Sequence, residues 1–129
     1  METTPCIIQG FIWRGNVLKT FLNAFIGEIQ LADDGVFEGF TTDYYGRAAI
    51  KGKVDGAALE FSKLYDPDSR GAKGEIDFLL RAQGYGNPGE IVCGGWKGVY
   101  TLRQQQVPGI KEPVDDRRGE ASCLIYPLP

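Results

Sequence analysis

The side chains of this chain best suited to chemistry are tyrosines set among lysines and arginines. The stretch Asp43-Tyr44-Tyr45-Gly46-Arg47 holds a tyrosine pair between an acid and a base. Phenols, amines and guanidinium groups that face a water-poor cavity can bind a polar ligand, or serve isomerase, lyase or decarboxylase chemistry. The candidate polar group comprises Tyr44, Tyr45, Lys63, Tyr65, Arg81, Tyr100 and Arg103.

The chain contains no histidine, which removes the commonest general base, the usual nucleophile pairs and the commonest metal ligand. Cys6, Cys93 and Cys123 are widely spaced and form no Cys-x-x-Cys pair, so neither a disulfide framework nor a cysteine zinc site is predicted. Neighbouring acids at 33–34, 66–68 and 115–116 fall in expected loops and are best explained as solvated turn acids. We therefore expect no metal and no cofactor.

The Asp43–Arg47 stretch has two interpretations. It can be a hairpin turn of four or five residues with two tyrosines at its tip, because Asp tolerates turn conformations and Gly46 can adopt the left-handed one. It can also be a loop at the mouth of a barrel whose phenols line an entrance, since loops often carry function. The turn is the favoured interpretation.

Short apolar and β-branched runs recur along the chain, with turn signals between them. This spacing is typical of a sandwich or barrel, and the tight hairpins favour an up-and-down order. Eighteen glycines, spread along the chain, suggest strongly curved sheet. The expected strands are 7–14, 24–31, 36–42, 47–54, 57–65, 75–85, 90–96 and 99–103.

Apolar and polar residues alternate along these strands, which predicts one buried and one solvated face. Lys63 departs from the pattern, because it shares the apolar face with Phe61 and Tyr65. A lysine there can extend its amine from a barrel rim, the favoured interpretation, or contact a ligand. Trp13 and Trp96 are expected near strand ends, where each can plug the barrel or form a ligand wall.

Charge and hydropathy restrict the partners. The formal net charge of −3 gives no basic footprint for nucleic acid. No apolar run approaches the roughly 18 residues of a membrane span. Because the N-terminus lacks a basic start and a long apolar core, we expect a cytoplasmic protein without a secretion signal.

The last part of the chain changes character. Residues 105–129 are rich in glutamine, proline and charge, so we expect a barrel domain over 1–104 followed by an irregular tail. The apolar tip Leu124-Ile125-Tyr126-Pro127-Leu128-Pro129 is expected to dock on the barrel or on a neighbouring subunit, which would make a homo-oligomer.

Residues 7–103 resemble the calycin-type barrels, a group that includes lipocalins, avidins and fatty-acid-binding proteins. The resemblance rests on Gly10-Phe11-Ile12-Trp13, on the hairpin Asp34–Gly39, and on the late stretch Gly94–Leu102. It implies an all-β fold with an eight-stranded antiparallel up-and-down barrel. Fold likeness alone does not transfer function.

Three functions are compatible with this fold. The first is a protein that binds a small apolar or aromatic ligand in the barrel, because eight strands are just wide enough to hold one. The second is a histidine-free enzyme that uses Tyr65, Tyr100, Lys63 and Arg81. The third is a structural or interaction module with a packed barrel. Non-enzymatic ligand binding is the favoured hypothesis, and packing of Phe25, Phe61, Phe78 and Trp96 through the interior would argue against it.

Overall fold

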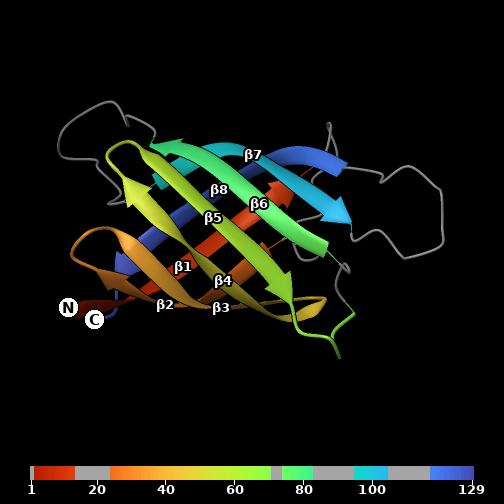
Figure 1. The fold of residues 1–129 in the computed structure, drawn as a ribbon, viewed down its shortest axis with the longest axis horizontal. Coiled ribbons are helices and arrows are strands. Elements are labelled where there is room, and N and C mark those ends of the chain that lie inside the picture. The colour runs from red at the N-terminus through yellow and green to blue at the C-terminus, as the bar shows by residue number, and fades with distance from the viewer. Residues whose placement is uncertain (1, 14–23, 71–73, 83–94, 105–116) are drawn as a thin grey trace.

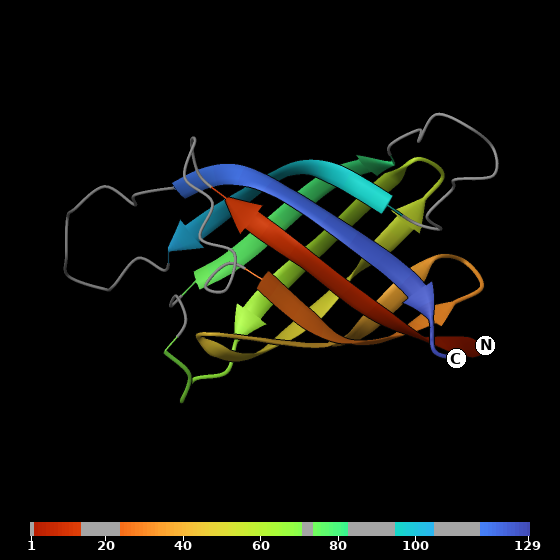
Figure 2. The same ribbon diagram turned by 180° about the vertical axis from the view of Figure 1, so that it is seen from behind.

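The chain forms a closed barrel of eight antiparallel strands in up-and-down order (Figures 1 and 2). The structure, a computed structural model, describes residues 2–13, 24–70, 74–82, 95–104 and 117–129, except the side chains of 103, 104 and 117. The strands are β1 (Thr3–Trp13), β2 (Ala24–Ala32), β3 (Val36–Asp43), β4 (Gly46–Asp55), β5 (Ala58–Tyr65), β6 (Gly74–Ala82), β7 (Gly95–Gln104) and β8 (Arg117–Pro127). Among the described residues, no helix is long and apolar enough to cross a membrane.

The expected all-β, eight-stranded up-and-down barrel is confirmed, but its last strands differ from the prediction. The expected strands 90–96 and 99–103 do not form a hairpin, because Gly95–Gln104 is one continuous strand; residues 90–94 lie outside the described part. Gly98 is not a turn residue. A Cβ on Gly98 would lie 2.1 Å from the carbonyl oxygen of Leu79, so this glycine permits a close approach between strands.

The expectation of an irregular tail is wrong for Arg117–Pro127. This segment is β8, which pairs with both β7 and β1 and thereby closes the barrel. Its charged start conceals an alternating strand, in which Ala121, Cys123 and Ile125 are buried. The two chain termini consequently lie side by side (Figure 2), and the Leu128 N–H donates to the Pro5 carbonyl oxygen at 3.1 Å.

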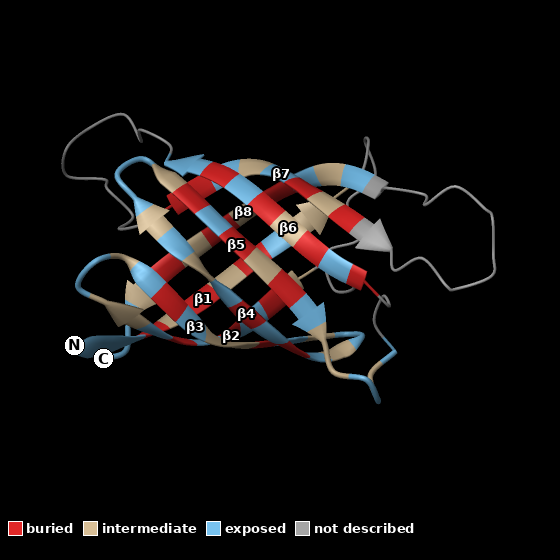
Figure 3. Cartoon of the chain, in the orientation of Figure 1, coloured by how far each residue is buried: buried red, intermediate tan, exposed pale blue. Residues whose placement is uncertain are grey.

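Apolar side chains on the inward faces of the strands are buried, and buried and exposed residues alternate along the strands (Figure 3). Phe78 is the centre of the aromatic core. Its ring stacks on Phe61 with centroids 4.3 Å apart, and it contacts Phe25 at 5.9 Å and Tyr100 at 6.2 Å. Phe37 extends the series, 6.1 Å from Phe61. Aromatic rings therefore occupy the middle of the interior.

Glycines allow this small barrel to curve as tightly as it does. A Cβ on Gly27 would lie 1.8 Å from the carbonyl oxygen of Phe40, so the backbones of β2 and β3 can approach only if residue 27 has no side chain. Gly10 approaches both a backbone and a ring, because a Cβ there would lie 2.4 Å from the Ser122 carbonyl oxygen and 2.7 Å from the Phe25 Cζ. Bends and ring packing together explain the high glycine content.

Deleting residues 117–129 should unfold the protein. The truncation removes three buried core residues and leaves β1 and β7 as unpaired edges, which promote aggregation. We expect loss of dispersed amide signals in NMR spectra and loss of a cooperative thermal transition. Deletion of Leu128 and Pro129 alone is the control and should leave the fold intact. A folded 1–116 fragment would contradict the role of β8.

Candidate functional site

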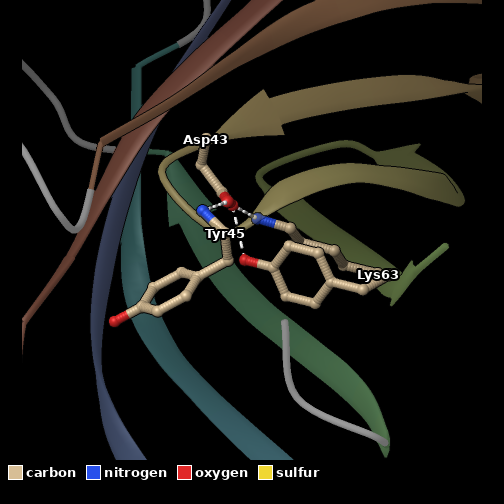
Figure 4. Close-up of polar contacts among 4 residues, drawn as sticks. Asp43, Tyr45 and Lys63 are labelled. Carbon is tan, nitrogen blue, oxygen red and sulfur yellow. Dashed lines mark hydrogen bonds and ion pairs between the residues drawn. The ribbon is translucent and has the colours of Figure 1, made fainter. Parts of the chain in front are cut away.

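A polar cluster centred on Asp43 (Figure 4) lies where β3 ends, at the end of the barrel opposite to the chain termini (Figure 1). The Lys63 ammonium lies 2.6 Å from Asp43 Oδ2, and the Tyr65 hydroxyl donates to the same oxygen at 2.5 Å. The other carboxylate oxygen, Oδ1, accepts the Tyr45 N–H at 2.8 Å. One carboxylate thus joins the end of β3, the β3–β4 turn and two residues of β5.

Turn chemistry positions Asp43. The strands β3 and β4 are joined by the two residues Tyr44 and Tyr45, and Gly46 takes a positive φ of 128°, a conformation that other residues rarely adopt. The Arg70 N–H donates to the Tyr45 carbonyl oxygen at 2.9 Å, which ties the turn to the loop after β5. The predicted hairpin with two tyrosines at its tip is confirmed, but two residues join its strands and not the four or five expected.

A small residue on the intervening strand lets the cluster form. Asp43 on β3 and Lys63 on β5 are separated by β4. Ala48 of β4 pairs with Thr41 on one side and Tyr65 on the other, and it is fully buried. Because its side chain is a single methyl group, the longer β5 side chains can reach across β4 to the carboxylate.

Lys63 is a buried cation in aromatic surroundings. The residue is only 2 % exposed, and its Nζ lies 4.9 Å from the Phe25 ring centroid and 4.8 Å from that of Tyr65. Burial lowers the Lys63 pKa, while the charge of Asp43 and the hydrogen bond to it act in the opposite direction. Burial, followed by the bond to Asp43, raises the pKa of Tyr65 above its ordinary range. The expectation that the Lys63 amine extends into water from the barrel rim is therefore wrong, because the amine is buried.

The structure brings together four of the sequence-predicted site residues. Lys63 and Tyr65 bind Asp43 directly, and the Tyr45 ring lies 6.3 Å from Tyr65. Tyr44 packs edge-on against Tyr45 at 5.3 Å and is half exposed.

The other predicted residues lie apart from this cluster. Tyr100 belongs to the aromatic core, and Trp96 is buried near the start of β7, where its Nε1 has no hydrogen-bond partner among the described residues. Trp13 lies on the outer wall, since its Nε1 donates to Glu120 and the Lys97 amine lies over its ring. Arg81 is exposed at the end of β6. The side chain of Arg103 is outside the described part of the chain.

Asp43 is the functional candidate that the sequence-based site prediction missed. It was assigned only a turn role, which it does fulfil through Oδ1. A signal was available, because a lysine on an apolar face requires a counter-charge. Asp43 is the acid that continues the inward face of β3 after Phe37 and Thr41. Identifying it as the partner required the pairing order of β3, β4 and β5.

This arrangement can bind a polar group or exchange a proton. Lys63 offers an amine with a lowered pKa, Asp43 an acceptor and Tyr65 a hydroxyl, within one hydrogen-bonded cluster. Among the described residues, no three Cys, Asp or Glu side chains gather closely enough to hold a metal ion. Comparisons of the chain with family models, curated proteins and solved structures give no match.

Stability should depend on pH through Lys63. Because its pKa is lowered, the unfolded chain binds more protons than the folded one between that lowered pKa and the ordinary value of about 10.4. The contribution of Lys63 to the free energy of unfolding should therefore rise with pH through this window. The groups that face the amine are Asp43, Tyr65 and, through Tyr65, Tyr45.

The measurement compares urea unfolding of the wild type and Lys63→Met between pH 7 and 10. Burial raises the pKa of Cys6, and that of Cys123 to about 12, so both thiols lower stability in both proteins toward high pH. The predicted quantity is therefore the difference between the two proteins, which should shift in favour of the wild type as pH rises. If the difference in unfolding free energy between the two proteins did not change with pH, the lowered pKa of the buried Lys63 amine would be contradicted.

Proposed function

We propose that this protein binds a small apolar or aromatic ligand that carries a hydrogen-bond-accepting group, at the barrel end formed by Asp43, Lys63 and Tyr65. The main support for this proposal is the set of hydrogen-bond donors on the Lys63 amine. Its Nζ has three donors, and among the described residues Asp43 is its one hydrogen-bond acceptor, while ring faces surround the rest. An accepting group on a ligand would use the remaining donors.

The energetic cost of the cluster supports a functional role. Well-packed apolar residues often replace a buried ion pair without loss of stability, so an ion pair such as Asp43–Lys63 is a weak contribution to folding. Perturbed ionisable groups concentrate at functional sites. A cation lined by Phe25 and Tyr65, one inward position from the end of β5, suits a ligand with an apolar body and a polar end.

The filled middle of the barrel restricts where the ligand can lie. Phe25, Phe61, Phe78 and Trp96 are all buried in one core cluster, the packing that argues against a ligand in the centre. We therefore assign the ligand to the barrel end beside the tyrosine turn. Tyr44 and Tyr45, half exposed and more than a third exposed, are available to flank an entrance there.

Native mass spectrometry of the purified protein, compared with its denatured mass, tests this proposal. We expect a reproducible extra mass on the folded chain, or saturable binding of an added aromatic carboxylate such as 2-naphthoate. Lys63→Met should weaken binding about tenfold or more, because a hydrogen bond to a charged group contributes roughly 1.5–3 kcal/mol. Lys53→Met, at an exposed lysine of β4, is the matched control. Equal binding by the two variants would overturn the assignment to Lys63.

A second candidate function is self-association through the outer wall. A groove of about 490 Å³ lies over β8, β1 and β2, and its lining includes the apolar side chains of Phe11, Ile26 and Leu124 beside the core residues Phe25 and Cys123. Phe11 and Ile26 are 46 % and 53 % exposed. The same native spectra test it: Ile26→Glu should reduce any dimer, whereas Leu79→Glu, at a similarly exposed site on β6, should not.

A further inference from the structure

We propose that Lys63 is a nucleophile that forms an imine with small apolar or aromatic aldehydes at this barrel end. The inference rests on the proposed function and narrows its ligand to a carbonyl compound. It assigns the three polar side chains of the cluster distinct roles in one covalent reaction.

Geometry distinguishes Lys63 from the other described lysines. Lys51, Lys53 and Lys97 are exposed to water. Lys63 lies on the inward face at 2 % exposure, with Phe25 and Tyr65 rings against its Nζ. An amine becomes a useful nucleophile when it is held neutral in an apolar site. The lowered pKa of Lys63, caused first by burial, agrees with this role.

The neighbouring groups complete the acid–base requirements. Asp43 Oδ2, 2.6 Å from Nζ, can accept the ammonium proton and so release the nitrogen lone pair. Tyr65 donates to the same oxygen at 2.5 Å, and burial with this bond raises the pKa of its phenol, so it stays protonated as a donor. One carboxylate therefore connects the amine to a hydroxyl that can act on the carbonyl oxygen.

The reaction balances without an added reagent. The Lys63 ammonium gives a proton to Asp43, and the neutral nitrogen attacks the aldehyde carbon, forming a C–N bond while the C=O π pair moves to oxygen. That oxygen takes the proton of Tyr65, which regains one from Asp43, and Asp43 then takes a proton from the nitrogen, giving a carbinolamine. Protonation of the hydroxyl from Asp43 expels water as the nitrogen lone pair forms C=N. The Lys63 ammonium and the aldehyde thus become water and a protonated imine, which pairs with the Asp43 carboxylate.

Reductive trapping tests the inference on the full chain. The protein is incubated with 2-naphthaldehyde and sodium cyanoborohydride, and the modified lysine is located by peptide mapping. We expect the naphthylmethyl group on Lys63 at least tenfold faster than on any exposed lysine, and no such preference in protein unfolded by guanidinium. The rate should rise with pH and level off at a lower pH than for exposed lysines. Lys53→Met should keep the rapid label, and Lys63→Met should lose it.

Two further variants separate chemistry from folding. Tyr65→Phe should slow labelling of Lys63 by about 100-fold or more if its hydroxyl transfers the proton. Lys63→Met leaves the buried Asp43 carboxylate without a counter-charge, so the double variant Asp43→Asn/Lys63→Met provides a folded protein that must also lack the rapid label.

The alcohol 2-naphthalenemethanol cannot form an imine. Its binding, measured by calorimetric titration, therefore tests the proposed ligand site separately from the imine inference. If the alcohol binds at this barrel end but Lys63 is labelled no faster than exposed lysines, the imine inference is wrong while ligand binding stands. If neither the alcohol nor the aldehyde engages the folded protein, both are overturned. Rapid labelling of Lys63 alone would support the imine inference. Weaker binding of the alcohol to Ala48→Leu, a change at the adjacent buried position, would support the proposed ligand site.

Discussion

Asp43→Asn is expected to lower the free energy of unfolding by about 3–5 kcal/mol at pH 7, the cost of leaving one member of a buried ion pair without its partner. The asparagine keeps an oxygen for the Tyr45 N–H, so the loss reports on the contacts of Oδ2 with Lys63 and Tyr65 and not on the turn. Side chains of the pair are only 5 % and 3 % exposed, which leaves little water to replace the carboxylate. Urea unfolding followed by tyrosine and tryptophan fluorescence measures the change.

A double-mutant cycle isolates the ion pair. Asp43→Asn/Lys63→Met removes both charges, so it should be more stable than Asp43→Asn alone. The penalty of the single variant should also shrink as pH rises, because a neutral lysine needs no counter-charge. Asp68→Asn, at an exposed loop acid, is the control and should change stability by less than about 0.5 kcal/mol. Additive single effects would contradict the pairing of Asp43 with Lys63.

Phe78→Ala is the second change with a large expected effect, a loss of about 3–5 kcal/mol of unfolding free energy. Phe78 is 2 % exposed and contacts three rings, those of Phe61, Phe25 and Tyr100. Removing it deletes apolar burial and leaves a cavity that the closed sheet cannot easily collapse to fill.

Leu79→Ala is the matched control for this core variant. Leu79 is the next residue on the same strand, but it points outward and is 55 % exposed, so its loss should cost less than about 0.5 kcal/mol. Similar small effects for both variants would show that the middle of the barrel is not packed in solution. In that case a ligand in the barrel centre would again be the favoured hypothesis.

Local patterns were sufficient for most of the scaffold. Period-two alternation identified the inward faces of β2, β4, β5 and β6, because successive side chains of a strand point to opposite sides. The turns were recognised from residues that tolerate positive φ, and Gly35, Gly46 and Gly56 adopt it. The same local signals gave a wrong prediction for the two C-terminal strands. Gly98 permits strand contact and does not form a turn, and the charges at the start of β8 concealed its alternation.

Residue patterns along each strand predict an all-β barrel with aromatic inward faces and put Lys63 on one of these faces, since these properties depend on neighbours along the strand. Strand pairing is needed to show that Asp43 is the partner of Lys63, that Trp13 lies on the outer wall, and that β8 closes the barrel between β7 and β1. Each of these depends on which strands pair and in what register. Residues 20 positions apart, such as Asp43 and Lys63, meet only after β3, β4 and β5 have aligned across Ala48.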